Sequence, residues 1–136
     1  MNFRLVRQSA VSLDRDPALL QRAADELARH RINVDGLSAL DARKQGVIRL
    51  RTNNAERAKE VLDRIGVRFT ETEVFEFDLP NKPGRLEAVC EALAGAGVNV
   101  DYVYGTYRDS VQHVRIMLKA SPVDRAKGIL HELPSD

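Results

Sequence analysis

The chain has 136 residues, of which 43% are apolar and 30% are charged, and its formal net charge is +1. These proportions are typical of a soluble globular protein, and a charge so near zero excludes an overall field that would draw the chain to nucleic acid or to an anionic membrane. The length suits one ordinary domain or two very small ones. Because half of this chain would form only a marginal core, two halves should pack together.

Three local features predict a cytoplasmic protein. Residues 1–7 contain no apolar core of the kind that a secretory signal needs. No apolar run approaches the ~20 residues that span a bilayer. The single cysteine, Cys90, cannot form an internal disulfide, and its apolar helical register indicates a small buried hydrophobic side chain in a reducing compartment.

The first half of the chain is expected to run strand, helix, strand, strand, helix, strand. A strand over 8–13 precedes a helix with Pro17 near its first turn, where a missing N–H costs nothing. Further strands are expected from residue 32 to 34 or beyond, over 47–51 and over 67–71. Apolar residues at i, i+3, i+4 and i+7 line one face of the second helix: Ala58, Val61, Leu62 and Ile65.

The second half is expected to repeat this order without the last strand. Over 74–79 apolar and acidic residues alternate, which is the period-2 pattern of a half-buried strand. A helix then begins near Pro83 and stops at Gly95 and Gly97, and strands follow over 98–104 and 114–118. Apolar stripes line the two helices: Leu86, Val89, Cys90 and Leu93 in the first, and Ala126, Ile129, Leu130 and Leu133 in the second.

The two halves are copies of one module. Residues 16–20 align with 82–86 at an offset of 66, and the same offset places 32–35 on 98–101. Two additional residues in the second copy raise the offset to 68, which aligns 57–59 with 125–127. An internal repeat of this kind determines the architecture.

The element order of each copy is that of the split βαβ arrangement. We therefore predict an α+β protein of two tandem ferredoxin-like βαββαβ modules, 1–72 and 73–136, with antiparallel sheets paired side by side. The second module lacks a fourth strand of its own. The apolar segment that begins at Phe3 is spare, and residues 3–7 either complete the second sheet or form a frayed N-terminus beside a three-stranded sheet.

A known family resembles this pattern. Residues 78–86, with the run Asn81-Lys82-Pro83-Gly84, followed by Gly97-Val98-Asn99, look like the signature of the ACT domain. In that family a strand ends in a loop with Asn and Pro-Gly, a helix follows, and Gly-x-Asn opens the second strand. Each motif alone is weak, whereas the combination at this separation is fairly specific, and the repeat extends the resemblance over nearly the whole chain.

The resemblance implies that a small ligand, an amino acid, binds at the seam between modules, with no cofactor. Loop 80–85 would then face Asn33 and Val34, and loop 14–18 would face Asn99 and Val100. A glycine at 84 permits close backbone approach, and a helix N-terminus suits a carboxylate. The implied ligand-binding residues are Leu79, Pro80, Asn81, Lys82, Pro83, Gly84, Arg85 and Leu86, together with Asn33, Val34, Asn99, Val100 and Asp101.

The first copy departs from the signature, because Arg15 and Ala18 stand where the family has Asn and Gly. Added bulk, with Asp14 and Asp16 flanking the turn, argues against a carboxylate site there. We therefore expect one competent site, built from loop 80–85, and one degenerate site. Asp16 is expected to cap its helix.

Structural roles compete with ligand contact at several of these positions. Asn81 could stabilise a turn, and Asn99 recurs as Asn33, which would fit a shared structural role. The tyrosines of the second copy could pack on the sheet or at a module interface, or one of them could face the ligand: Tyr102, Tyr104 and Tyr107.

No constellation for catalysis, metal binding or nucleic-acid binding stands out. The three histidines, His30, His113 and His131, lack metal-ligand spacing, and the strands lack the basic-aromatic motif that stacks RNA bases. We expect a non-catalytic, allosteric regulatory protein that forms a homodimer. The alternative is an interaction module that regulates a partner enzyme without binding a ligand.

Overall fold

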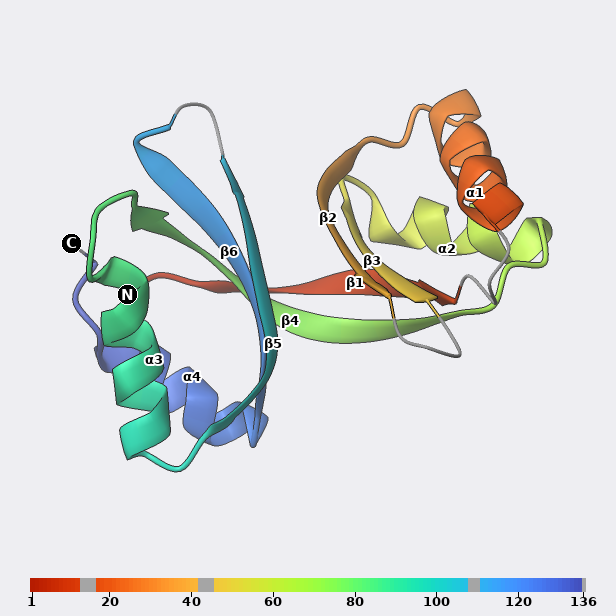
Figure 1. Cartoon of the computed structure of the whole chain (residues 1–136). Coiled ribbons are helices and arrows are strands. Elements are labelled where there is room, and N and C mark those ends of the chain that lie inside the picture. The colour runs from red at the N-terminus through yellow and green to blue at the C-terminus, as the bar shows by residue number, and fades with distance from the viewer. Residues whose placement is uncertain (13–16, 42–45, 108–110, 136) are drawn as a thin grey trace. The chain divides into compact units, whose positions relative to one another are not determined.

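The structure is a computed structural model, and it describes residues 1–12, 17–41, 46–107 and 111–135. Figure 1 shows the helices and strands of the chain. Their order is β1 (Arg4–Ser12), α1 (Pro17–Arg29), β2 (Val34–Asp41), β3 (Gly46–Thr52), α2 (Ala55–Arg64), β4 (Phe69–Pro80), α3 (Arg85–Gly95), β5 (Asn99–Tyr107), β6 (His113–Ser121) and α4 (Val123–Glu132). No helix in the described part is both long and apolar enough to cross a membrane.

The chain forms two compact units. The first unit is Arg7–Thr72, and the second unit joins Met1–Val6 to Glu73–Asp136. Strands β1 and β4 each contribute to both units, because the boundaries fall inside them. The N-terminal segment therefore belongs to the second unit, although the whole first unit separates it from the rest of that unit in sequence.

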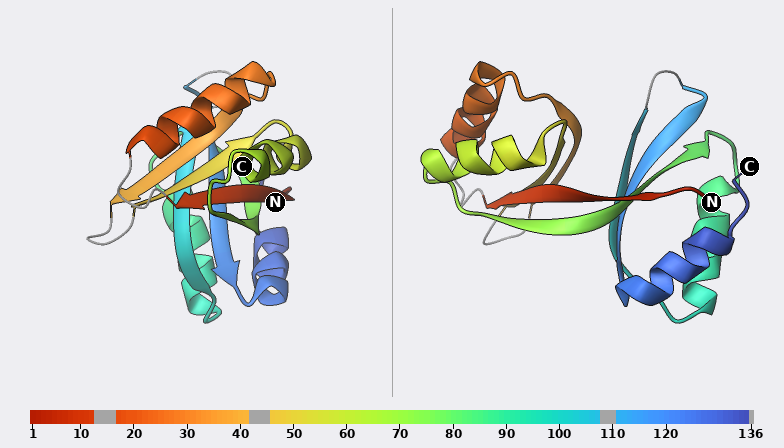
Figure 2. Two further views of the ribbon diagram at one scale, coloured as in Figure 1. Left: turned by 90° about the vertical axis from the view of Figure 1, so that its right-hand side faces the viewer. Right: turned by 180° about the vertical axis from the view of Figure 1, so that it is seen from behind.

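Each unit has a four-stranded sheet of the predicted kind. The strand order is β2-β3-β1-β4 in the first unit and β1-β4-β6-β5 in the second. The pairs β1–β3, β2–β3, β4–β6 and β5–β6 are antiparallel. Both helices of a unit cover the same face of its sheet, as Figures 1 and 2 show. The predicted α+β class with tandem ferredoxin-like modules is confirmed.

The core of each unit forms between the sheet and its two helices. In the second unit Phe75, Phe77 and Leu79 of β4 pack against Val89 and Leu93 of α3. The first unit has the corresponding arrangement, with a core of buried residues from both its helices, from β1 and β3, and from the segments just before β2 and β4: Val11, Ala23, Leu27, Ile32, Ile48, Leu50, Ala58, Val61, Leu62 and Val67. The alternation over 74–79 thus marks the face that meets the helices, but the strand is not half-buried as predicted, because Val74 and Glu76 on its other face are also buried.

The helical stripes are narrower than the sequence predicts. Leu86 is 42% exposed and Cys90 is only half-buried. Leu20, which aligns with Leu86, is also 37% exposed. Both leucines lie in the first part of their helices, although Leu19 beside Leu20 packs partly against the core. At the other end, Ile65 caps α2 and Leu133 caps α4, so neither lies inside its helix.

Strand β4 is longer than expected. It runs for 12 residues, from Phe69 to Pro80, and joins the two strands that were predicted separately over 67–71 and 74–79. The intervening residues, Thr72 and Glu73, supply no turn chemistry, so nothing interrupts the extended backbone.

The N-terminal segment packs onto the second unit. The ring of Phe3 meets that of Phe75 edge-on, with centroids 5.3 Å apart. Met1, Phe3 and Leu5 are partly buried against the core of that unit, and Arg4 forms an ion pair with Glu76. Apolar contact and charge pairing together therefore hold this segment against β4.

Candidate functional site

The loop between β4 and α3 is held by main-chain contacts. The N–H of Asn81 donates to the carbonyl of Gln112 at 2.8 Å, and its side-chain amide donates to the carbonyl of Val111 at 2.7 Å. The N–H of Lys82 donates to the carbonyl of Pro80 at 2.8 Å. The Asn81 side chain thus ties its loop to the segment before β6, which is the turn-stabilising role.

Gly84 connects the loop to the first turn of α3. It is the N-cap residue of α3, with φ +88° in the left-handed region, and no side chain caps the helix there. A Cβ at this position would meet nothing within 4 Å, so backbone conformation and not crowding favours glycine. The uncapped first turn leaves N–H groups open to an anion.

The side chains of the loop differ in what they can reach. Leu79 is 6% exposed and belongs to the core, so its side chain is not available to a ligand. Arg85 is half-buried. The remaining members that follow the strand are exposed: Asn81, Lys82, Pro83, Gly84 and Leu86.

The same side-chain hydrogen bond, from an asparagine to an aspartate, occurs at the start of the second strand in each unit. The side-chain amide of Asn99 donates to Asp101 Oδ1 at 2.6 Å, and that of Asn33 donates to Asp35 Oδ1. In each strand the register shifts by one residue at the aspartate, between Val34 and Gly36 and between Val100 and Tyr102. The asparagine therefore stabilises a β-bulge in both copies.

The two bulges differ in their charge balance. Asp35 Oδ2 also accepts a hydrogen bond from Arg51 Nη1 at 2.7 Å, and both side chains are largely buried. Asp101 is exposed, and within the described residues its carboxylate has only Asn99 as a partner. The second copy thus presents an acceptor that the first copy has neutralised. Val34 and Val100 are half-buried against their own cores.

The predicted ligand-binding residues cannot all meet within the second unit. Loop 81–84 and Asn99 lie at opposite ends of α3, whose 11 residues span about 16 Å (Figure 1). One amino acid cannot contact both within the second unit. Asn33 and Val34 belong to the first unit, so their approach to loop 80–85 stays a prediction.

The three tyrosines of the second copy lie on β5. Tyr102 and Tyr104 stack with ring centroids 6.4 Å apart, and Tyr107 is 60% exposed. In loop 14–18, residues 14–16 lie outside the described part of the chain, and with them the predicted cap at Asp16. The main-chain contacts of Val111 and Gln112 escaped the sequence analysis, because backbone carbonyls leave no residue-type signal.

A family model described as an ACT domain pair matches residues 4–133. The chain belongs to this family. No curated protein shows significant similarity to this ACT domain pair.

Solved structures share its fold. The protein BT0572 from Bacteroides thetaiotaomicron has a TM-score of 0.88 at 23% identity, over 97% of this chain and 90% of that one. The ligand-free regulatory subunit of aspartate kinase from Thermus thermophilus has a TM-score of 0.65 at 15% identity, over 97% and 96% of the two chains. The regulatory subunit from Thermus flavus has a TM-score of 0.60 at 15% identity, over 96% and 94%.

Proposed function

We propose that this ACT domain pair is a non-catalytic regulatory protein that binds an amino acid between two modules. The observation that carries the proposal is the uncapped N-terminus of α3, entered through Gly84 in the left-handed region beside an exposed loop. Open N–H groups at a helix start favour a carboxylate, which every free amino acid has.

The polar groups near the second strands suit the rest of such a ligand. An asparagine amide offers both a donor and an acceptor, which can pair with the two ends of an amino acid. Because loop 81–84 and Asn99 lie at opposite ends of α3, the ligand would bridge a loop from one module and a second strand from another. We place loop 80–85 opposite Asn33 and Val34, with residues 1–6 counted in the second module.

The loop of the first copy is proposed to be degenerate, because Arg15 and Ala18 replace the family's Asn and Gly. One competent site per chain follows. A homodimer in the cytoplasm, in which the ligand shifts the balance between two arrangements through its differential affinity for them, would make the protein allosteric.

The relatives support a regulatory role in a wider assembly. Two of them are regulatory subunits of aspartate kinase, so a partner enzyme is a reasonable target for this chain as well. The second candidate function is an interaction module without a ligand of its own. The occupied amide of Asn81 favours it, because that group already donates to Val111.

A thermal-shift screen against the twenty amino acids tests the proposal. A ligand that binds only the folded state stabilises it by ~2.7 kcal/mol at a hundredfold excess over its dissociation constant. We expect one amino acid, or a few related ones, to raise the melting temperature. No shift with any of them would favour the interaction module.

Two matched pairs of variants then locate the site. Gly84→Ala and Gly66→Ala each place a Cβ at a positive φ in open space, but only Gly84 lies beside the loop. Binding should weaken in Gly84→Ala alone. Asn33→Ala and Asn99→Ala remove the same bulge contact from the two copies. Greater loss of binding in Asn33→Ala would support the proposed placement, and equal retention in both would contradict it.

A further inference from the structure

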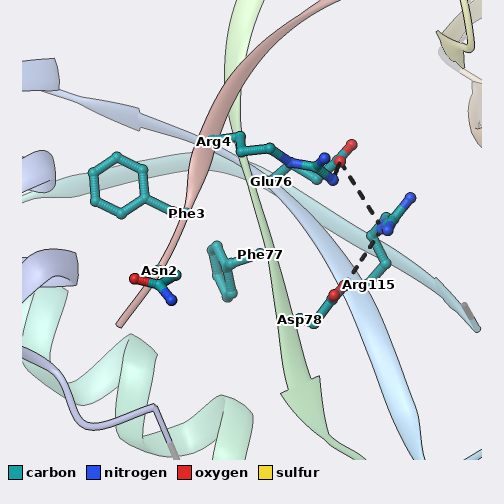
Figure 3. A pocket seen from close by; sticks show the side chains of 7 residues that line it. All are labelled: Asn2, Phe3, Arg4, Glu76, Phe77, Asp78 and Arg115. Carbon is teal, nitrogen blue, oxygen red and sulfur yellow. Dashed lines mark hydrogen bonds and ion pairs between the residues drawn. The ribbon is translucent and has the colours of Figure 1, made fainter.

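The second unit contains a charged cavity that lies outside loop 80–86. Residues of β4, β6 and the N-terminal segment line an open cavity of about 200 Å³ (Figure 3). Arg4, Glu76, Asp78 and Arg115 line it, with Phe3 and Phe77 beside them. All of these residues belong to the second unit, so the cavity is complete within it.

A fully buried carboxylate organises the cavity. The side chain of Glu76 is 0% exposed and pairs with Arg4 Nη2, while Arg115 Nε lies 3.9 Å from Glu76 Oε1. The same Nε lies 3.3 Å from Asp78 Oδ1. The two ion pairs hold the guanidinium of Arg115 in place, and its side chain is only 17% exposed.

The cavity has guanidinium N–H groups that donate no hydrogen bond to the described residues. Each guanidinium carries five N–H groups, yet Arg4 contributes only Nη2 and Arg115 only Nε to the bonds made with described residues. Glu76 and Asp78, in contrast, each take part in at least one further interaction. The unused Nη1 and Nη2 of Arg115 form a fork that matches the two oxygens of a carboxylate or phosphate group.

The first unit shows that the fold does not require these charges. Its equivalent cavity, between β1, β3 and the start of β4, is lined by Ala10, Ser12, Val47, Arg68, Phe69 and Thr70. By the repeat, Ala10, Ser12 and Val47 stand where the second unit has Glu76, Asp78 and Arg115. Buried charge is costly to keep, so its presence in one copy alone indicates a role other than stability.

We propose that this cavity binds a small oxyanion, a free carboxylate or phosphate, through the unused guanidinium donors of Arg115 and Arg4. Glu76 and Asp78 position the two arginines and do not contact the ion. This inference does not depend on amino-acid binding at loop 80–85, since it uses none of that loop's residues.

Nuclear magnetic resonance titration of the full chain tests the proposal. Inorganic phosphate and succinate are added separately, at constant ionic strength, while the Nε–Hε signals of the arginines are followed. We expect saturable shifts of the Arg115 signal with at least one probe, and the stronger of the two identifies the class of oxyanion. Linear, unsaturated shifts with both probes would overturn the proposal.

The residues of the equivalent cavity in the first unit define a variant that should lack the oxyanion site. Glu76→Ala, Asp78→Ser and Arg115→Val together install the residues that the equivalent cavity already carries, so the fold should tolerate them. Binding of the better probe, followed through backbone amides near the cavity, should weaken roughly tenfold or more. Unchanged affinity in a folded triple variant would refute the site. If the variant does not fold, the wild-type titration still decides.

The Gly84→Ala variant separates the two proposals. It should bind the oxyanion probe as the wild type does, even where it has lost amino-acid binding. A parallel loss of oxyanion binding in Gly84→Ala would show that the ion binds at the start of α3 and would overturn the cavity as its site.

Discussion

Asn99 donates its side-chain amide to Asp101 at 2.6 Å, and Asp101 is the residue at which β5 shifts its register against β6. Asn33 and Asp35 make the same contact at the same irregularity in the first unit. The recurrence of the asparagine therefore has a structural cause, because both copies need a donor beside the bulged aspartate. Ligand contact at Asn33 or Asn99 would be an addition to that role.

Replacing the amide by a carboxylate should affect the two copies unequally. Asn99→Asp sets a second negative charge beside Asp101, which has no cationic partner among the described residues, and we expect a loss of ~1 kcal/mol. Asn33→Asp should cost less, since Arg51 neutralises Asp35. Urea unfolding at low and high salt measures both variants. Equal losses, unaffected by salt, would contradict the electrostatic cause.

Glycine substitutions should differ in sign with backbone conformation. Gly84→Ala and Gly66→Ala force a side chain onto φ +88° and +74° and should each lower the free energy of unfolding by about 1–2 kcal/mol. Gly128→Ala, within the exposed face of α4, should raise it by ~0.5–1 kcal/mol. Chemical denaturation of the three variants checks this. A stabilised Gly84→Ala would mean that this glycine is kept for ligand access alone.

The pair formed by Arg4 and Glu76 should matter more than other ion pairs at the surface. Arg4→Gln leaves the fully buried Glu76 carboxylate with fewer donors, and we expect a loss of ~1–2 kcal/mol, moderated by the exposure of Arg4. Arg7→Gln is the control. Its partner Glu56 is 77% exposed, and its other partner, Glu71, keeps Lys59 as a second cation, so the loss should stay below about 0.5 kcal/mol.

The double variant Arg4→Gln/Glu76→Gln extends this comparison. It removes the buried charge together with its partner and should recover part of the stability that Arg4→Gln loses, as seen by denaturant midpoint. A double variant less stable than the sum of the two single changes would show that Glu76 is held mainly by other groups.

The repeat provides an internal control for core packing. Leu27 and Leu93 occupy equivalent positions and are 1% and 0% exposed, so Leu27→Ala and Leu93→Ala should each cost about 2.5–5 kcal/mol. Leu20 and Leu86, also equivalent, are 37% and 42% exposed, and their alanine variants should cost less than ~1 kcal/mol. Differential scanning calorimetry would reveal any departure from this pairing.

Local patterns were sufficient to predict most elements. The alternation over 74–79 and the stripes at Val89 and Leu93 identified the faces that meet the core, because strand and helix periods are set by local geometry. The error at Leu86 arose because a stripe shows which face is apolar, while only the position of the helix on the sheet shows how many of its turns are covered.

By itself, the sequence determined the repeat, the element order, the ferredoxin-like class and the family resemblance, since these depend on residue types at short, regular spacings. Only the tertiary structure placed residues 1–6 in the unit formed by 73–136, and only it assembled the cavity of Arg4, Glu76 and Arg115. Those groups come from segments 72 and 39 residues apart in sequence, and such contacts follow from how strands pair in space, which no local period records.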